Sequence, residues 1–393
     1  MTLRTLDGLG DLTRLRVFVR VDFNVPMKDG AVADDMRIRA TLPTLRELLD
    51  RGAALVLGSH LGRPKGQVRE DLRLAPAGAR LAELLERPVT ALTETTPGEL
   101  PDDAVIVLEN LRFDPGEEAN DPAFAGKLAD LADAYVDDAF GAVHRAHASV
   151  SALPELMLAS GRPAVAGRLL QREVEVLSRL LNEPARPYVA VLGGAKVSDK
   201  LGTINALVDR VDALLIGGAM AFTLIAADGG AIGDALVEPD RFDEVRAARA
   251  RATERGIPIV LPVDVVAARE MSARARRETV AADRIPEGWK GLDIGPETVR
   301  AFASKIEDAR TVLWNGPMGV FELEPFAAGT FEVAKAIATS GAFSVVGGGD
   351  SLLAVKRAEL EDGFDHLSTG GGASLEFLEG RALPGITILE ETT

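Results

Sequence analysis

VFVRVDFNVP, residues 17–26, gives the clearest indication of the fold class. It begins as an apolar run around a single arginine, turns polar at Asp22 and ends at Pro26. Hydrophobicity that does not alternate is typical of strands buried on both faces, as in parallel sheets. Asp22 and Asn24 lie two positions apart, so on an extended chain they point to the same side. The stretch therefore predicts a buried strand whose carboxyl end presents a pair of polar side chains.

The same pattern recurs along the whole chain. Short apolar runs rich in Val, Ile and Leu occur at Ala53–Gly58, Val105–Leu108, Ala134–Val136, Val189–Leu192, Ala213–Ile216, Ile257–Leu261, Thr311–Trp314 and Phe343–Val346. Stretches with helical spacing of apolar residues lie between them, at Ile38–Arg51, Leu74–Leu85, Arg241–Arg255 and Thr330–Ser340. Alternation of strands and helices predicts an α/β protein with parallel sheets, and the number of strands favours two doubly wound lobes.

A helix and a break are predicted between the two lobes. Gly167–Leu181 carries the apolar stripe of one helix, and Asn182–Pro187 follows it with two prolines. We therefore place the first lobe at residues 1–166, the connecting helix and hinge at 167–186, and the second lobe at 187–375.

Composition excludes several classes of protein. The 393 residues include 44 Lys and Arg against 60 Asp and Glu, a formal net charge of −16, which disfavours nucleic acid as a partner. The absence of cysteine excludes disulfide scaffolds, thiol nucleophiles and Cys-ligated metal centres. No apolar run has the length of a membrane span, so we expect no membrane partner and a cytoplasmic location.

Glycine clusters follow four of the apolar runs in the second half. They are VLGGAK (191–196), LIGGAM (215–220), VVGGGD (345–350) and STGGGA (368–373). Glycines beyond the carboxyl ends of parallel strands let backbone amides approach an anion, so together they predict a phosphate-binding face. The P-loop pattern is absent and no G-x-G-x-x-G stands at a strand–helix turn, which disfavours a P-loop ATPase and an NAD-dependent dehydrogenase. A haloacid-dehalogenase-type phosphatase would need an aspartate where Asn24 stands.

Basic residues follow the strands of the first lobe. Arg37, Arg63, Arg112 and Arg145 come from four separate segments, and His60, His144 and His147 lie in two of the strand-end stretches. Guanidinium groups match phosphate and carboxylate geometry, so this set indicates a small, doubly anionic substrate. Any one of them taken alone could be a surface arginine or a structural histidine.

Two lysines and two carboxylates mark the second lobe. Lys196 and Lys200 are four residues apart; on a helix beginning near Ala195 they would share one face and hold a polyphosphate. Asp350 could complete a Mg²⁺ site together with nucleotide phosphates and water. Glu322 is suited to ribose hydroxyls, although a solvated loop glutamate is the alternative.

The chain resembles the phosphoglycerate kinase family over essentially its full length. The matching stretches, in the family's order, are RVDFNVP (20–26), MRIRA (36–40), SHLGRP (59–64), ENLRF (109–113), AFGAVHRAH (139–147), GGAKVSDK (193–200), KGLDIGP (290–296), NGPMGVFE (315–322), GGGDS (347–351) and TGGGAS (369–374).

This resemblance implies two Rossmann-like lobes joined by a helix, with a C-terminal segment, about 376–393, that returns to the first lobe. It implies a monomer that transfers phosphoryl between 1,3-bisphosphoglycerate and MgADP, giving 3-phosphoglycerate and MgATP. The implied phosphoglycerate-binding residues are Asp22, Phe23, Asn24, Arg37, His60, Leu61, Gly62, Arg63, Arg112 and Arg145. The implied nucleotide-binding residues are Lys196, Lys200, Gly291, Glu322, Gly348, Gly349, Asp350 and Ser351, with Asp350 on Mg²⁺.

Such a reaction needs positioning and charge neutralisation rather than a base, because a carboxylate acceptor is already ionised at neutral pH. We assign that role to Arg37 and Lys196, assisted by backbone amides near Gly371 and Gly372. Since the two cations lie on different lobes, we expect hinge closure around both substrates.

Two positions depart from the family's usual pattern. Asp137 stands where an asparagine is usual, which adds a charge near the basic site, and Ser351 replaces the commoner threonine. A catalytically silent binding module for sugar or acid phosphates is the alternative function; it would keep the arginines but lose Lys196, Asp350 or the glycine turns, and all of these are present.

Overall fold

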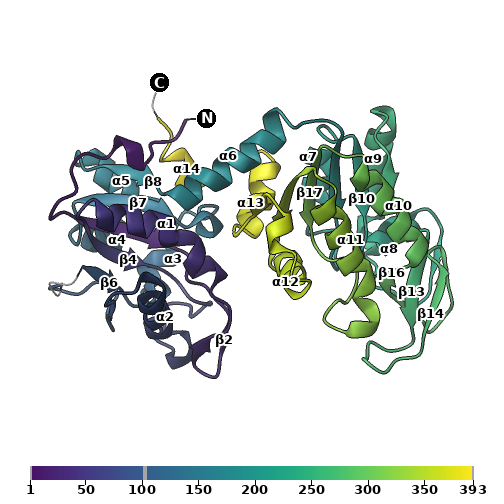
Figure 1. Ribbon diagram of the computed structural model, residues 1–393, viewed down its shortest axis with the longest axis horizontal. Coiled ribbons are helices and arrows are strands. Elements are labelled where there is room, and N and C mark those ends of the chain that lie inside the picture. The colour runs from purple at the N-terminus through teal and green to yellow at the C-terminus, as the bar shows by residue number, and fades with distance from the viewer. Residues whose placement is uncertain (1, 101–103, 392–393) are drawn as a thin grey trace. The chain divides into compact units, whose positions relative to one another are not determined.

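The computed structural model describes residues 2–100 and 104–391. The chain divides into two compact units, whose elements are labelled in Figure 1. Unit 1 comprises residues 1–175 and 382–393, and unit 2 comprises residues 176–381. The chain passes from one unit to the other within α6 (Arg168–Asn182). The returning segment begins at Ala382 rather than near residue 376, because Glu379 still belongs to unit 2, where its carboxylate accepts a hydrogen bond from Thr203.

Unit 1 is built on a parallel sheet, which has six strands among the described residues. Across the sheet they are β5 (Thr90–Ala91), β6 (Val105–Val107), β4 (Ala54–Gly58), β1 (Arg16–Val21), β7 (Ala134–Asp138) and β8 (Ala164–Ala166). Besides the first half of α6 and short 3-10 helices, unit 1 contains α1 (Met36–Asp50), α2 (Ala75–Leu85), α3 (Pro115–Glu118), α4 (Pro122–Ala129), α5 (Ala152–Ala159), α14 (Pro384–Thr387) and the hairpin of β2 (Met27–Lys28) and β3 (Ala31–Val32). β4, β5 and β6 lie on one side of β1 and β7 and β8 lie on the other, so the strand order reverses at β1 and the sheet is doubly wound, as predicted.

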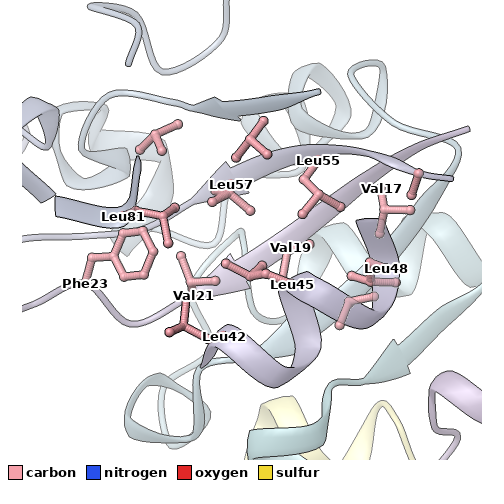
Figure 2. Close-up of a cluster of buried hydrophobic side chains, with 14 of the residues drawn as sticks. Val17, Val19, Val21, Phe23, Leu42, Leu45, Leu48, Leu55, Leu57 and Leu81 are labelled. Atoms are coloured by element: carbon pink, nitrogen blue, oxygen red, sulfur yellow. The ribbon is translucent and has the colours of Figure 1, made fainter. Parts of the chain in front are cut away.

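The strand residues of unit 1 are buried on both faces of the sheet. Figure 2 shows Val17, Val19 and Val21 of β1 packed with Leu42 and Leu45 of α1. The alternate residues of the same strands face the other side, where the rings of Phe18 and Tyr135 stack with centroids 6.0 Å apart. Burial on both faces explains why the sequence shows continuous apolar runs instead of alternation.

The two ends of the described chain meet within unit 1, as Figure 1 also shows. Leu3 forms a bridge with Glu390, and the amide of Arg4 donates to the Leu389 carbonyl at 2.9 Å. The C-terminal segment is thus hydrogen bonded to the N-terminal one.

Unit 2, all of whose residues the structure describes, contains a second six-stranded parallel sheet. Its strands, in spatial order, are β12 (Ile259–Val260), β10 (Ala213–Ile216), β9 (Tyr188–Leu192), β17 (Thr311–Asn315), β18 (Phe343–Gly347) and β19 (His366–Leu367). Its helices are α7 (Leu201–Leu207), α8 (Met220–Ala227), α9 (Phe242–Glu254), α10 (Pro296–Glu307), α11 (Ala328–Thr339), α12 (Gly349–Arg357) and α13 (Gly372–Leu378).

Unit 2 also holds an antiparallel sheet that the sequence did not predict. It consists of β14 (Arg277–Ala281), β13 (Asp264–Ala268) and β16 (Lys290–Ile294), and a short parallel pair joins β11 (Ala231–Ile232) to β15 (Arg284–Ile285). β14 is largely exposed and rich in polar residues, so it lacks the apolar signature on which the other strands were recognised.

Candidate active site

Unit 1 gathers its predicted polar residues at one edge of its sheet. They follow β6, β4, β1 and β7, which are neighbours in that order. Because these strands are parallel, their carboxyl ends meet at the same edge. Four segments far apart in sequence are thereby brought together.

Arg37 lies in the first turn of α1 and forms an ion pair with Asp22 at the end of β1. Its Nη1 is 2.6 Å from Asp22 Oδ2 and 3.4 Å from the Asn24 carbonyl. A cation at a helix N-terminus opposes the helix dipole, and the buried Asp22 carboxylate offsets that cost. Asp35 does not neutralise Arg37, because its carboxylate forms ion pairs with Arg39 and Arg80 at 2.9 and 2.7 Å.

Main-chain groups join the end of β1 to the loop after β4. Asn24 Oδ1 accepts from the Gly62 amide at 3.0 Å, and the Gly62 carbonyl accepts from Arg112 at 2.9 Å. Phe23 and Leu61 have buried side chains that belong to the hydrophobic core. These two residues can therefore offer a ligand only their backbone groups.

His60 is surrounded by positive charge. It is 5% exposed, and its pKa is lowered well below the usual value, first by burial and then by nearby Arg20, Arg112 and Arg37. Burial and then the charge of Arg20 also lower the pKa of Arg112, and Arg145 adds to this effect against the opposing influence of Glu118 and Glu117. Cations that depress one another's pKa form a site ready to receive an anion.

Arg63 and Arg145 complete the predicted set and are both exposed. Each lies on a strand-end segment, Arg63 after β4 and Arg145 after β7. The predicted residues of unit 1 therefore lie at one edge of the sheet, which we call the basic edge. Arg37, Asn24 and Arg112 are fixed there by hydrogen bonds, whereas the side chains of Arg63 and Arg145 are open to solvent.

Unit 2 contains a cavity of about 320 Å³ at the carboxyl ends of its strands. Its wall is largely apolar and includes Phe222, Leu292, Met318 and Val320, while Glu322 and Asp350 add carboxylates. An apolar cavity with a few polar groups is typical of a small-molecule site. The sequence analysis predicted Glu322 and Asp350 but not the apolar wall. Three motifs could have indicated it: LIGGAM precedes Phe222, NGPMGVFE contains Met318 and Val320, and KGLDIGP contains Leu292.

Two glycines bring backbone close to this cavity where a side chain would not fit. A Cβ on Gly291 would lie 2.2 Å from the Phe222 ring, and one on Gly193 would lie 2.1 Å from the Pro317 carbonyl oxygen. Gly291 thus lets β16 pack against α8, and Gly193 lets the loops after β9 and β17 touch.

The prediction that Lys196 and Lys200 share one helical face was wrong. α7 begins only at Leu201, and residues 195–200 before it are a non-helical segment that ends in a turn at 198–200. Lys196 is exposed, whereas Lys200 is 9% exposed and its ammonium donates to the carbonyl and side-chain oxygens of Asn315. Burial lowers the pKa of Lys200 to about 8, against the opposing influence of Asp199 and Asp350. Asn315 therefore holds the Lys200 ammonium inside the fold, whereas the Lys196 side chain is open to solvent.

Gly348–Ser351 comprise the N-cap and the first three residues of α12. Gly348 has φ 90° and precedes the helix, Asp350 is exposed in its first turn, and the buried Ser351 hydroxyl accepts from the Gly316 amide at 2.6 Å. Gly371 and Gly372 stand similarly at the start of α13. Backbone amides at both helix starts are available to an anion.

No group of three or more His, Asp or Glu residues suited to a metal ion occurs among the described residues. Of the carboxylates that line the cavity, Asp293, Glu322 and Asp350, it is Asp350 that lies in the first turn of α12, directly after Gly348 and Gly349. A single carboxylate fits a Mg²⁺ ion that keeps its waters and is carried largely by nucleotide phosphates.

Asp293 is a further cavity residue that the sequence did not single out. It lies at the end of β16, is 3% exposed and accepts from the amides of Gly329 and Ile294 at 2.7 and 2.9 Å. Burial raises its pKa to about 7. Its hydrogen bond with Gly329 connects β16 to the start of α11. Asp293 lies within the motif KGLDIGP, which was the sequence signal that could have indicated it.

Comparisons with known proteins agree over the whole chain. The family model described as phosphoglycerate kinase matches residues 6–381. A phosphoglycerate kinase of Rubrobacter xylanophilus is 54% identical over 387 residues, which cover 97% of each chain. One of Roseiflexus castenholzii is 51% identical over 399 residues and 99% of each chain.

Solved structures give the same result for the fold. Phosphoglycerate kinase from Coxiella burnetii matches with a TM-score of 0.86 and 40% identity over 98% of both chains. The enzyme from Pyrococcus horikoshii matches with a TM-score of 0.85 and 33% identity, covering 99% of this chain and 98% of that one. By family model, sequence identity and fold together, the chain belongs to the phosphoglycerate kinase family.

Proposed function

We propose that the strand-end residues of unit 1 bind the acid substrate of a phosphoglycerate kinase reaction and that the cavity of unit 2 binds its nucleotide. The reaction is reversible phosphoryl transfer from 1,3-bisphosphoglycerate to MgADP, which yields 3-phosphoglycerate and MgATP in glycolysis and gluconeogenesis. The observation that carries this proposal is the pairing, within one family member, of an arginine cluster with an apolar cavity flanked by glycine turns.

The acid substrate is assigned to unit 1. A carboxylate and a phosphate need several cations and hydrogen-bond donors, and the strand-end residues supply both. The proposed set is Asp22, Phe23, Asn24, Arg37, His60, Leu61, Gly62, Arg63, Arg112 and Arg145.

The nucleotide is assigned to unit 2. The apolar wall suits a purine base, Glu322 suits ribose hydroxyls, and the lysines and glycine turns suit phosphates. The proposed set is Lys196, Lys200, Gly291, Glu322, Gly348, Gly349, Asp350 and Ser351. Mg²⁺ would be held by Asp350 and nucleotide phosphates, where it would neutralise phosphate charge.

Catalysis then consists of positioning and neutralisation. The acceptor carboxylate is ionised at neutral pH, so no general base is required for direct in-line transfer. Arg37 and Lys196, with amides near Gly371 and Gly372, would stabilise charge on the transferred group. Since these cations belong to different units, closure of the hinge around both substrates is part of the proposal.

The remaining features of the proposal concern partners and location. We expect a monomer in the cytoplasm, where the phosphorylated intermediates of glycolysis are held, without nucleic-acid or membrane partners. Among the described residues, no helix combines the length and the apolar character that a bilayer crossing requires.

Hydrogen exchange with each ligand alone tests the site assignment. We expect 3-phosphoglycerate to slow exchange in segments 22–24, 60–63, 110–113 and 139–147, and MgADP to slow it in 193–200, 290–294, 315–322 and 347–351. Protection of unit 2 by the acid, or of unit 1 by the nucleotide, would contradict the assignment.

A further inference from the structure

Arg20 is a fully buried cation that the proposed site does not use. It lies in β1 and is 0% exposed. Its Nε donates to the Ser149 hydroxyl at 2.8 Å, one Nη donates to the Val21 carbonyl, and the other lies 3.1 Å from His60 Nδ1. The three hydrogen bonds of the guanidinium are therefore all made inside the protein, and one of them is to His60, a residue of the proposed substrate site.

The contact with His60 can have only one direction. A guanidinium has five N–H donors, no acceptor, and stays protonated at any relevant pH. His60 Nδ1 must accept the hydrogen bond, so it carries no proton. Burial and the neighbouring Arg20, Arg112, Arg37 and His147 favour the neutral ring by lowering the pKa of His60. A neutral imidazole with an unprotonated Nδ1 carries its proton on Nε2.

Arg20 is itself held by a buried hydrogen-bond chain. The Ser149 hydroxyl, which accepts from Arg20, donates to Glu117 at 2.6 Å, and the Ser149 amide donates to the other carboxylate oxygen at 2.9 Å. Glu117 is 0% exposed. Asp137, also fully buried, provides a second carboxylate near the guanidinium. These contacts fix the position of the guanidinium and compensate its charge.

We propose that Arg20 is a positioning residue that holds His60 in its Nε2–H tautomer, so that His60 offers a donor to an anionic oxygen of phosphoglycerate. This inference rests on the proposed substrate site. No hydrogen bond links His60 Nε2 to another described residue, so that N–H is available to a ligand. With the opposite tautomer, a lone pair would face the anion and repel it.

Nitrogen NMR of the full chain labelled at histidine tests the tautomer directly. Only four histidines are present, and the His60→Gln variant assigns the resonance. At pH 7 the ring of His60 should show an unprotonated Nδ1 and a protonated Nε2, and 3-phosphoglycerate should shift the Nε2 proton. A protonated Nδ1, an imidazolium or an unshifted Nε2 proton would overturn the proposal.

Kinetics test the consequence. Arg20→Lys keeps the positive charge but loses the planar fork, so we expect a mixture of tautomers and a KM for 3-phosphoglycerate raised about 10- to 100-fold, with the KM for ATP unchanged. Arg16→Lys, at the other end of the same strand, should change neither. The double variant Arg20→Lys, His60→Gln should be no worse than His60→Gln alone.

If the double variant raised the KM for 3-phosphoglycerate by the product of the two single-variant factors, or if Arg20→Lys changed both KM values equally, Arg20 would have a merely structural role and the inference would be overturned. Failure of the proposed function would look different: the unmodified protein would bind no phosphoglycerate, whatever tautomer the spectrum shows.

Discussion

Arg37 illustrates how a residue can be unfavourable for its own helix and still be fixed in place. It opposes the dipole of α1, yet the ion pair with Asp22 holds it at the end of β1. The sequence showed the local conflict but could not show the partner, because Asp22 is fifteen positions away and the pairing depends on how α1 packs. The same limit applied to Lys200, whose partner Asn315 is distant in sequence.

Arg37→Ala should lower kcat far more than it raises the KM for 3-phosphoglycerate. A cation that acts mainly on the charge of the transferred group stabilises the transition state more than the bound substrate, and losing such a group costs about 10²- to 10³-fold in kcat. Steady-state kinetics with both substrates varied measures the split. Arg39→Ala, two residues along the same helix and paired with Asp35, is the matched control and should retain activity. A change in KM alone would mean that Arg37 only binds.

Asp137→Asn should alter how stability depends on pH. Burial raises the pKa of Asp137 to about 6, opposed in part by the Ala139 amide, Arg20 and Tyr135. The folded chain therefore holds this proton to higher pH than the unfolded chain does. Its stabilising contribution is complete below about pH 4 and is lost as the pH rises through 6.

Asparagine cannot ionise, so the variant does not lose this stability as the pH rises. Its free energy of unfolding minus that of the parent should increase by about 1.4 kcal/mol per pH unit between pH 4 and 6, and this difference should stay constant above pH 7. Urea unfolding at several pH values measures the difference. Asp133→Asn, at an exposed position, is the control. A difference that does not vary with pH would rule out this origin.

At the scale of elements, apolar periodicity was sufficient for the buried strands and the long helices. β10 runs from Ala213 to Ile216 as predicted, and α1 begins two residues before the predicted Ile38. β14 was not predicted because it is largely exposed and polar. β13 and β16 are mostly buried, but Asp264 in β13 and Lys290, Gly291 and Asp293 in β16 shorten their apolar runs. The turn at 195–200 was taken for helix because spacing alone cannot reveal a buried lysine.

Asp264 gives a test of how the missed sheet supports a helix. Gly295 caps α10 without a side chain, and Asp264 of β13 accepts from the amides of Glu297 and Thr298 at 3.0 and 2.8 Å instead. Asp264→Ala should cost about 1–3 kcal/mol, since it also leaves the buried Thr298 hydroxyl without this partner. Asp121→Ala removes the exposed cap of α4 and should cost about 1 kcal/mol. Urea unfolding compares them, and equal losses would contradict a role for burial.

For the whole molecule, the net charge of −16 did not forbid an anionic substrate. Positive charge is concentrated at one edge of one sheet, where cations lower one another's pKa, while carboxylates dominate elsewhere. The sequence indicated this concentration through four arginine-bearing segments. It could not indicate the apolar cavity wall, which comes from residues on separate elements that meet only after folding.

Closure should be visible in solution scattering. With 3-phosphoglycerate and a non-reactive Mg²⁺–nucleotide bound together, the radius of gyration should fall below that of the ligand-free chain, because both substrates must be enclosed to exclude water. Either ligand alone is the control and should produce less compaction. An unchanged radius in the ternary complex would contradict hinge closure.

The most direct measurement is Mg²⁺-dependent ADP formation from ATP with and without 3-phosphoglycerate, using hydroxylamine to trap the acyl phosphate as a hydroxamate. We expect ADP only when Mg²⁺, ATP and the acid are all present, with one hydroxamate formed for each ADP. Lys196→Met should abolish most of this activity, whereas Lys335→Met, at an exposed position on α11, should not. ADP formation at the same rate without the acid would contradict phosphoglycerate kinase activity.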